Sequence, residues 1–209
     1  MTPHALHFAH LTAWKRSLMA KGRDSGMPSV EQWESYFDAA GVLDSFGLRD
    51  LSGDAIEFGC GYGTFTIEAA RRTLGAFYAL NIDPLMVTAT TTRALQSGLK
   101  NVVVEQRDFV AHGCGRKPFS ATVAMLFNIL HIENPVSLLK EAHRVLRAGG
   151  QVAIIHWNYD VRTPRGPPLN IRPRPEQCRA WGEEAGLRWV RNVTLPGSPW
   201  HWGLLLARP

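Results

Sequence analysis

The sequence predicts an α/β fold built on a mostly parallel β-sheet, and three features of the chain support this prediction. From residue 54 onward, short β-type runs alternate with helical patterns, which is typical of βαβ units. A glycine-rich turn follows the first run directly and opens a helical pattern, as in sheets that bind a ligand at their carboxyl edge. The 209 residues are 45% hydrophobic and 20% charged, which excludes a disordered or fibrous protein.

The predicted elements follow one another in chain order. We expect strands at residues 54–58, 76–82, 101–106, 121–127 and 151–157, and helices between them at 64–73, 84–97 and 135–146. Arg147 and the pair Gly149-Gly150 are helix C-terminal signals, so the third helix should be closed there. A helix at 175–185, closed by Gly186, leads into β-type runs at 187–195 and 200–207. The short gap between these runs, about four residues, predicts an antiparallel hairpin at the sheet edge.

The first fifty residues show helical spacing and come before the sheet. One helix is indicated by Leu6, Leu11, Trp14 and Leu18, and a second, running on toward Phe46, by Val30, Trp33 and Phe37. Trp33, Tyr36 and Phe37 either roof a bound ligand or form the core of this N-terminal cap. Three histidines, His4, His7 and His10, share one helix face, but metal sites usually need better-anchored ligands, so we expect no metal.

Charge is distributed unevenly along the chain, whose net charge is +5. Residues 1–143 hold 13 Lys and Arg against 14 Asp and Glu, whereas residues 144–209 hold 10 arginines against 4 acidic residues. The arginine-rich part is either a surface that recognises anions or a solvated face. The 3 cysteines are odd in number and widely spaced, which favours a reducing compartment. With no apolar run long enough to cross a membrane and no signal peptide at the start, we expect a soluble cytoplasmic protein.

The turn Gly59-Cys60-Gly61-Tyr62-Gly63 is the strongest functional signal in the chain. Its glycines allow positive φ angles and close approach of a ligand to the backbone. Glu57 stands two residues before the first glycine, where a carboxylate would repel a pyrophosphate and favour a cationic ligand, such as one with an ammonium group. Thr64 also departs from the dinucleotide fingerprint, which has Gly or Ala at that place.

Two further strand ends carry acidic residues suited to a nucleoside. Asp83 follows the second strand, where a ribose would present its hydroxyl groups, and Asp108-Phe109 follows the third, where a carboxylate and a ring suit adenine. An Asp after a strand is often only a helix cap. Acidic residues at three successive strand ends, behind a glycine loop, are not easily produced by caps alone.

These motifs, together with later ones, resemble the class I S-adenosylmethionine-dependent methyltransferases of the small-molecule type. The matching residues are Glu57-x-Gly59-x-Gly61-x-Gly63, Asp83, Asp108-Phe109, the run 119–128, Leu130-His131 and the run 141–150. The resemblance covers about residues 54–158 and extends more loosely to the terminal hairpin. It implies a Rossmann-like sheet of seven strands with an antiparallel last strand. Residues 1–50 would then be an N-terminal helical cap of the same domain, and residues 51–209 the methyltransferase domain.

The resemblance also implies S-adenosylmethionine as the cofactor, lying along the tips of the first four strands. Its methionine part would face Glu57, Gly59, Gly61 and Gly63; its ribose would face Asp83, which precedes Pro84; and its adenine would face Asp108 and Phe109. Asn128, at the end of the fourth strand, counts as a further cofactor-binding residue. The stretch Asn128-Ile129-Leu130-His131 lacks the Asn/Asp-Pro-Pro-aromatic motif of nucleic-acid amino-group methyltransferases. We therefore expect a small-molecule acceptor and neither nucleic acid nor a membrane as partner.

Methyl transfer from a sulfonium needs alignment of the reactants and, for some acceptors, removal of one proton. His131, after the fourth strand, and His156, at the end of the fifth, are the candidate bases, because histidine titrates near neutral pH. Either ring could instead be structural, His131 as a helix cap and His156 as a packed side chain in the sheet.

The loop at residues 160–175 follows the fifth strand on the same edge as the predicted cofactor site. It holds five prolines and four arginines, so it is either a stiff lid that offers Arg165 and Arg172 to an anionic acceptor or a solvent-exposed connector. Two other functions stay open from the sequence. One is a non-catalytic nucleoside-binding module or an RNA-binding protein; the other is a nicotinamide-dependent oxidoreductase, which Glu57 and Thr64 disfavour.

Overall fold

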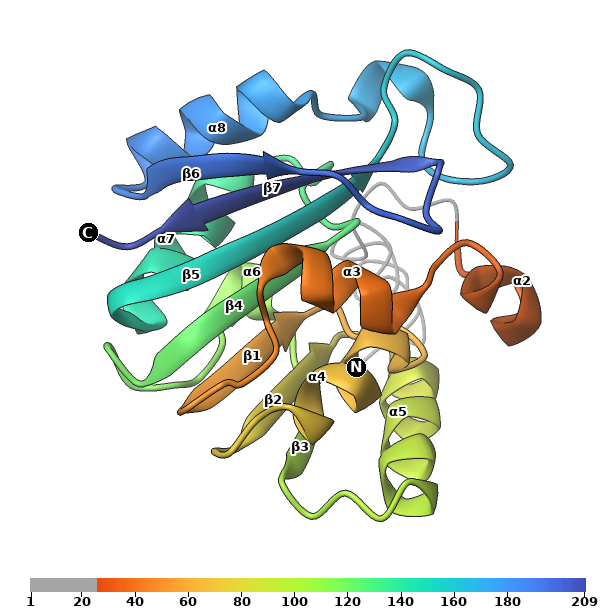
Figure 1. The fold of residues 1–209 in the computed structure, drawn as a ribbon, viewed down its shortest axis with the longest axis vertical. Coiled ribbons are helices and arrows are strands. Elements are labelled where there is room, and N and C mark those ends of the chain that lie inside the picture. Colours follow the sequence, from red (N-terminus) through yellow and green to blue (C-terminus); the bar gives the residue numbers. More distant parts are fainter. Residues whose placement is uncertain (1–25) are drawn as a thin grey trace, which may run out of the picture.

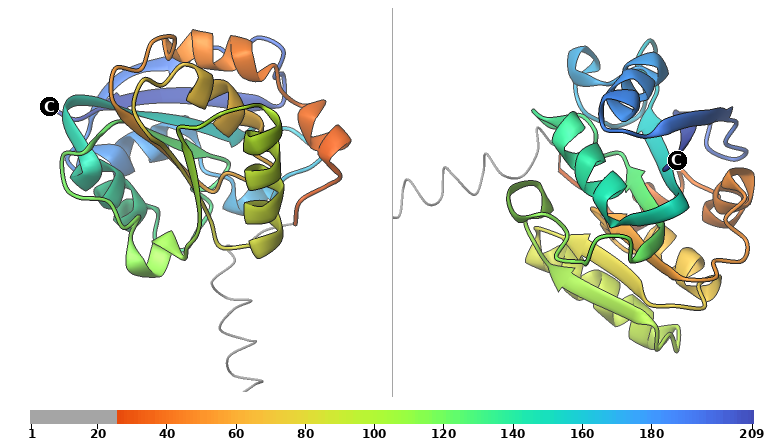
Figure 2. Two further views of the ribbon diagram at one scale, coloured as in Figure 1. Left: turned by 90° about the horizontal axis from the view of Figure 1, so that it is seen from below. Right: turned by 90° about the vertical axis from the view of Figure 1, so that its left-hand side faces the viewer.

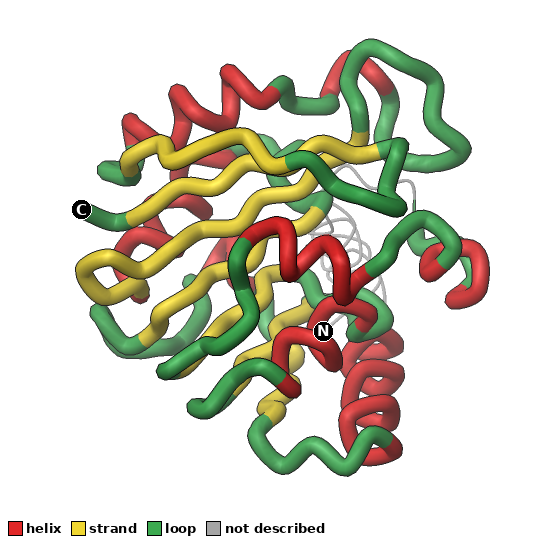
Figure 3. The backbone as a smooth tube through the Cα atoms, in the orientation of Figure 1, coloured by secondary structure: helices red, strands yellow, loops and turns green. Residues whose placement is uncertain are grey.

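A seven-stranded sheet forms the centre of the structure, a computed structural model that describes residues 26–209 (Figure 1). Its strands are β1 Asp54–Phe58, β2 Phe77–Asn81, β3 Val102–Gln106, β4 Ala121–Phe127, β5 Leu146–Trp157, β6 Arg188–Val193 and β7 His201–Ala207. They lie in the order β3-β2-β1-β4-β5-β7-β6 (Figure 3). The first five pair in parallel, whereas β7 pairs antiparallel with both β5 and β6. The predicted seven-stranded, mostly parallel sheet with an antiparallel last strand is thus confirmed.

Helices cover both faces of this sheet. The described helices are α2 Val30–Glu34, α3 Ala39–Phe46, α4 Thr64–Arg71, α5 Pro84–Gln96, α6 Phe109–His112, α7 Pro135–Val145 and α8 Pro175–Glu184, with a short 3₁₀ turn, η1, at Leu169–Ile171. Helices α3 and α4 lie on one face, and α7 and α8 lie on the other (Figure 2). The sheet is therefore buried on both sides, as parallel sheets usually are.

Two apolar layers follow from this arrangement, because successive side chains of a strand point to opposite faces. Along β1, Ala55 packs in the layer under α3 and α4, whereas Ile56 and Phe58 pack in the layer under α7 and α8. All three cysteines are buried free thiols. Cys60 belongs to the first layer, and Cys114 and Cys178 belong to the second.

The strand order reverses between β1 and β4, and this reversal positions the functional site. From β1 the chain crosses to β2 and then β3 on one side, while β4 and β5 lie on the other side of β1. The loops that leave β1 and β4 therefore diverge at the carboxyl edge of the sheet. Ligands of open α/β sheets bind in the crevice at such a switch point.

The second N-terminal helix differs from the prediction, because the stretch from Val30 to Phe46 forms two helices. Helix α2 ends at Glu34, and Asp38 adopts an extended conformation and accepts a hydrogen bond from the Gly41 N–H at 3.0 Å. This cap starts α3 in a new direction, and α3 then buries Val42, Leu43 and Phe46. The predicted helix at Leu6–Leu18 and the face with His4, His7 and His10 lie outside the described residues.

The closing signal of α7 also works differently from the prediction. The helix ends at Val145, and Leu146 is already extended and buried as the first residue of β5, opposite Ala121 of β4. Gly149, with φ of 74°, lies inside β5, where its N–H donates to the Arg208 carbonyl at 3.0 Å. The terminal hairpin lies at the sheet edge as predicted, but its connection spans residues 194–200 and is longer than expected.

Within residues 26–209, no helix combines the length and apolar character needed to cross a membrane. The same residues contain no cluster of three or more His, Cys, Asp or Glu side chains suited to a metal ion.

Candidate active site

A cavity of about 340 Å³ opens at the carboxyl edge of the sheet, where the strand order reverses. Its volume falls within the range of about 300–1,000 Å³ that is usual for small-ligand sites. The wall is built from the glycine loop after β1, the ends of β2, β3 and β4, and three residues of the N-terminal segment, Gly26, Met27 and Trp33. Of the sequence-predicted residues, the wall includes Glu57, Gly59, Gly61, Asp83, Asp108, Phe109, Asn128 and His131.

The glycine loop has the predicted backbone geometry, with φ of 85° at Gly59, 54° at Gly61 and 78° at Gly63. Gly59 and Gly61 lie on the cavity wall. Gly63 caps α4 and faces α5 instead, where an added Cβ would lie 3.0 Å from the Thr90 methyl carbon. The close packing against α5 therefore explains why position 63 is a glycine. Gly59 and Gly61, by contrast, leave the backbone open to a ligand.

Glu57 is only 2% exposed, and its carboxylate accepts a hydrogen bond from the Thr66 hydroxyl. Burial raises the pKa of Glu57 to about 8, so the carboxyl group is mostly protonated at neutral pH. A positive charge in the cavity would favour the ionised form, because opposite charges at short range stabilise each other strongly away from water. The chemistry of this residue thus fits a cationic ligand.

Asp83 and Asp108 act as helix caps and also line the cavity. Oδ1 of Asp83 accepts from the Leu85 N–H, and Oδ1 of Asp108 accepts from the Ala111 N–H, both at 2.9 Å. A carboxylate can accept about four hydrogen bonds, so capping does not exhaust either side chain. Both side chains thus form helix caps, and both residues line the cavity wall. Pro84 occupies the first turn of α5, is exposed and does not reach the cavity.

Asn128 lies at the end of β4 in the left-handed conformation, with φ of 56°. Its backbone N–H donates to the Ile155 carbonyl at 2.8 Å, which fixes the residue against β5. Both polar atoms of its side-chain amide are buried and find no hydrogen-bond partner within residues 26–209. The hydroxyl of Thr64, also on the wall, is in the same situation. Buried donors and acceptors are normally paired, so these two side chains fit a site where a polar ligand supplies the partners.

The two predicted bases lie side by side, but only one reaches the cavity. His131 is 7% exposed and lines the wall, whereas His156 is fully buried in β5 and does not. Nδ1 of His131 lies 3.2 Å from Nε2 of His156. Burial, followed by the neighbouring His131, lowers the pKa of His156 well below its ordinary value, so this ring is neutral. His156 therefore has no direct access to a ligand in this cavity.

Aromatic side chains form part of the cavity wall. Trp33, Phe65 and Phe127 line it, and the rings of Phe65 and Phe127 meet edge to face at 4.7 Å. Tyr36 and Phe37, the other two predicted roof residues, face the protein instead. Tyr36 packs against Trp157 at 5.3 Å, and Phe37 packs between Phe65 and His201. Trp33 thus joins the cavity, and its two neighbours belong to the core.

Residues 26–34, which we call the N-terminal strap, contribute Gly26, Met27 and Trp33 to the cavity wall and contact the rest of the protein at three points. The Tyr62 hydroxyl donates to the Pro28 carbonyl at 2.6 Å, Arg93 pairs with Glu34 at 2.5 Å, and Nη2 of Arg165 donates to the Gly26 carbonyl at 3.0 Å. Sequence reasoning missed Gly26 and Met27 as wall residues. No local pattern marks them, because their positions depend on partners far away in the sequence.

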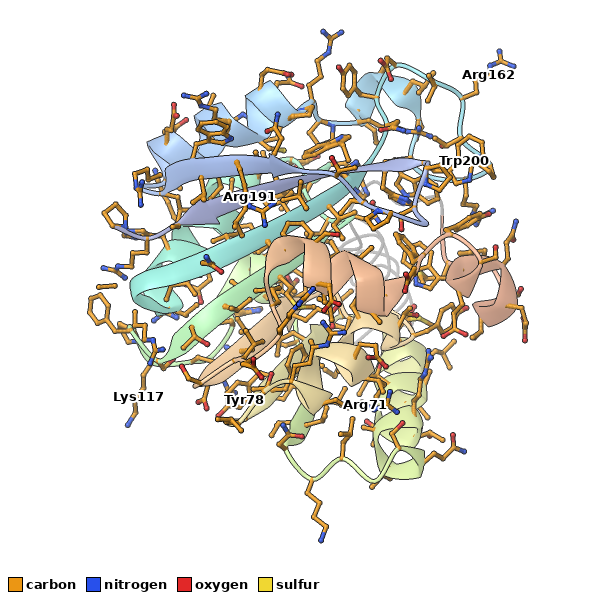
Figure 4. The ribbon with its side chains drawn as sticks, viewed as in Figure 1. Arg71, Tyr78, Lys117, Arg162, Arg191 and Trp200 are labelled. Carbon is orange, nitrogen blue, oxygen red and sulfur yellow. The ribbon has the colours of Figure 1, made fainter. Side chains whose placement is uncertain are left out.

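None of the four loop arginines lies on the cavity wall. Arg172 is 9% exposed, and its guanidinium donates to the carbonyls of Pro167, Asn158 and Arg165 at 2.7–3.3 Å. Arg165 reaches the strap, and Arg174 stacks on Tyr159. Arg162 points away from the body of the molecule (Figure 4). The geometry shows Arg172 as an internal clamp of this loop, and a role in acceptor binding for Arg165 and Arg172 stays a prediction.

Known proteins resemble this chain in sequence and in structure. A family model described as a methyltransferase domain matches residues 55–150. The ubiquinone biosynthesis O-methyltransferase of Pseudomonas aeruginosa is 26% identical over 163 residues, which cover 69% of this chain and 68% of the relative. A SAM-dependent methyltransferase from Aquifex aeolicus has a similar fold, with a TM-score of 0.74 and 24% identity over 84% of this chain and 92% of its own. A putative sarcosine dimethylglycine methyltransferase from Galdieria sulphuraria aligns with a TM-score of 0.64 and 16% identity, over 81% and 83% of the two chains.

Proposed function

Because this chain is a class I S-adenosylmethionine-dependent methyltransferase, we propose that it methylates a small molecule at a hydroxyl group carried by an aromatic ring. The observation that carries the proposal is the position of His131, which shares the cavity wall with the glycine loop and with Trp33, Phe65 and Phe127. Aromatic walls favour a planar ring, and a phenolic hydroxyl, with an ordinary pKa near 10, needs a base to lose its proton near neutral pH.

The cavity residues fit the cofactor by their own chemistry. Glu57 would hold the ammonium group, while the unpartnered groups of Thr64 and Asn128 would take up polar atoms of the methionine part. Asp83 would accept from the ribose hydroxyls, and Asp108 from the adenine amino group, beside the ring of Phe109. When bound, S-adenosylmethionine supplies an electrophilic methyl group. The protein aligns the two reactants and excludes water from between them.

His131 would remove the acceptor proton while the aromatic wall holds the ring. The curated relative from Pseudomonas aeruginosa is by its name an O-methyltransferase, which favours oxygen as the attacked atom. An anionic acceptor held by the loop would instead require Arg165 and Arg172 to leave the backbone carbonyls that they contact. The aromatic wall needs no such rearrangement.

Cofactor binding is tested first, by thermal denaturation with S-adenosylmethionine, S-adenosylhomocysteine, NAD and NADP. A ligand at 100 times its dissociation constant adds about 2.7 kcal/mol of apparent stability, which raises the melting temperature clearly. We expect this rise with the two S-adenosyl compounds and none with the nicotinamide cofactors. A rise only with NAD or NADP would overturn the assignment of this cavity.

The acceptor class is tested with phenols and catechols, matched against the same rings whose hydroxyls are already methylated. We expect methyl transfer to the free hydroxyls only. His131→Ala should lower kcat by about 10² or more with little change in cofactor affinity. His143→Ala, a histidine on α7 away from the cavity wall, serves as the matched control and should keep full activity. Transfer to amines or thiols but to no phenol would contradict the proposed acceptor.

A further inference from the structure

We infer that His156 is a positioning residue that fixes the tautomer of His131, so that Nδ1 of His131 carries the proton and Nε2 keeps its lone pair for the acceptor. The inference rests on the proposed role of His131 as the base. It gives a function to a fully buried histidine that has no access to the cavity.

The two rings meet because β4 and β5 are parallel neighbours in the sheet. Phe127 of β4 pairs with Ile155 of β5, so His156 follows that pair along β5 while His131 comes just after the end of β4. The rings stand nearly perpendicular, at 77° with their centroids 5.3 Å apart, and Nδ1 of His131 lies 3.2 Å from Nε2 of His156. On its other side the His156 ring stacks on Trp202 of β7.

The number of protons on the His156 ring determines the direction of the hydrogen bond between His131 and His156. His156 is neutral, because burial disfavours its charged form and the facing groups His131, His201 and Arg172 disfavour it further; the Trp157 carbonyl alone acts in the opposite sense. A neutral imidazole carries one N–H. Nδ1 of His156 lies 3.5 Å from the Trp157 carbonyl oxygen, a long contact in which the oxygen can only accept. The proton of His156 therefore belongs on Nδ1, and its Nε2 is an acceptor.

An acceptor at Nε2 of His156 determines the state of His131. Nδ1 of His131 must donate across the 3.2 Å contact, so the neutral ring has its lone pair on Nε2. In this tautomer Nε2 carries the lone pair that a general base uses. When His131 takes up a proton from an acceptor hydroxyl, the hydrogen bond to His156 also stabilises the imidazolium, since hydrogen bonding to a charged form favours it.

The test is ¹⁵N NMR of histidine-labelled protein without cofactor or acceptor, because ring-nitrogen shifts distinguish a protonated from an unprotonated nitrogen. In the parent protein we expect a protonated Nδ1 and an unprotonated Nε2 at His131. His156→Leu removes the acceptor and should move the proton toward Nε2. His156→Gln should restore the parent pattern, because its side-chain carbonyl oxygen can accept from Nδ1.

The matched control is His201→Phe, which replaces another buried histidine on the neighbouring strand β7. It should leave the His131 shifts unchanged, because burial, the largest cause of the lowered pKa of His156, still keeps that ring neutral without His201. In turnover, His156→Leu should lower kcat about tenfold and leave cofactor affinity unchanged, with recovery in His156→Gln. If the parent protein holds the His131 proton on Nε2, or if His156→Leu leaves the shifts where they were, the inference is overturned.

The NMR readout also separates this inference from the proposed function. A protein with the expected tautomer that methylates no phenol keeps the positioning role of His156 and loses the proposed acceptor. A phenol methyltransferase whose His131 carries its proton on Nε2 keeps the acceptor and loses the positioning role.

Discussion

Glu57 is buried in a state that a cationic ligand would change. With a pKa of about 8, its carboxyl group is protonated in most molecules at pH 7, and the Thr66 hydroxyl is its hydrogen-bond partner. An ammonium group in the cavity favours the carboxylate, so binding should release a proton below pH 8. Affinity for the cofactor is thereby coupled to pH through one side chain.

We expect S-adenosylmethionine to bind more tightly as the pH rises from 6 toward 8, by up to about tenfold per pH unit, because less work is then needed to ionise Glu57. Calorimetry in buffers of different ionisation enthalpy measures both the affinity and the proton released. Glu57→Gln should bind more weakly and with no proton release. A parent protein whose affinity stays flat over this range would rule out the coupling.

Asn128 combines a strained backbone with an unpaired buried amide, which is typical of a residue kept for function. The free energy of unfolding of Asn128→Gly should equal that of the parent protein or exceed it by up to about 1 kcal/mol, because glycine adopts positive φ freely. The same change should weaken cofactor binding at least tenfold. Urea denaturation and calorimetry measure the two effects.

Phe119 offers the matched control for this substitution. It is the other non-glycine residue with positive φ in residues 26–209, at 59°, and its side chain is exposed and stacks on Arg208. Phe119→Gly relieves the same backbone strain away from the cavity and should leave cofactor affinity unchanged. Equal losses of affinity in both variants would show that Asn128 acts only through the backbone.

The N-terminal strap couples the first described residues to the cavity. Because Tyr62 follows the glycine loop and bonds to the Pro28 carbonyl, strap and loop should move together. The strap contributes Met27, whose methyl carbon would lie 3.2 Å from a Cβ added at Gly61. The strap is thus a part of the cavity wall that is held by a few polar contacts.

Tyr62→Phe removes the hydrogen bond to Pro28 and should speed cofactor dissociation about two- to tenfold, because a hydrogen bond contributes about 0.5–1.5 kcal/mol. Stopped-flow displacement measures the rate. Tyr78→Phe is the control, since Tyr78 stacks on Arg116 from the amino half of β2, away from the cavity wall (Figure 4). Identical dissociation rates in Tyr62→Phe and the parent would show that this tie does not hold the strap over the ligand.

Elements whose signals are local could be predicted from the sequence, and those that depend on distant partners could not. The glycine loop and Asp83 stand within a few residues of buried strands, so their place at the sheet edge follows from the alternation of strands and helices. The strap joins Tyr62 to a residue 34 positions earlier, and no periodicity reports such a contact. The predicted end of α7 was wrong because Leu146 is extended and pairs with Ala121 of β4, a partner that lies 25 positions earlier in the sequence.

Site residues show the same division. The sequence placed His131 and His156 at neighbouring strand ends, but which ring reaches the cavity depends on how each side chain leaves its strand. The loop arginines were predicted from composition, which counts charges without showing their partners. The guanidinium of Arg172 binds the backbone carbonyls of Pro167, Asn158 and Arg165, which come together around it only in the folded protein.

The stability of the whole protein should depend on pH through three buried groups. Burial lowers the pKa of His201 to about 3 and that of His156 well below 6.5, so the unfolded chain binds more protons below pH 6.5 and stability falls as the pH falls. The effect of Glu57 on the pH dependence of stability is opposite to that of the two histidines. Its folded pKa of about 8 lies above 4.5, so the folded protein binds more protons and stability falls as the pH rises from 4.5 to 8.

These opposing slopes predict a maximum of the free energy of unfolding near pH 6.5. Each group changes the free energy of unfolding by about 1.4 kcal/mol per pH unit at most. Below pH 6.5 the combined effect of the two histidines exceeds that of Glu57, and above pH 6.5 only Glu57 contributes. Urea denaturation at pH 5, 6.5 and 8 measures the curve. Glu57→Gln should flatten the alkaline side, and His201→Phe should flatten the acidic side. A steady rise of stability from pH 6.5 to 8 in the parent protein would contradict the buried neutral state of Glu57.

The reactivity of the three free cysteines can be used to measure local opening of this protein. A thiol reagent attacks the thiolate, and burial raises the pKa of Cys60 to about 12, that of Cys114 to about 11 and that of Cys178 further still. Each thiol should stay unreactive until the structure around it opens by local unfolding. Cys60 sits in the glycine loop, Cys114 just after α6 and Cys178 in α8, so labelling followed by mass spectrometry times the opening of three separate regions. Because Cys60 lies on the cavity wall, its labelling rate alone should slow when that cavity is filled.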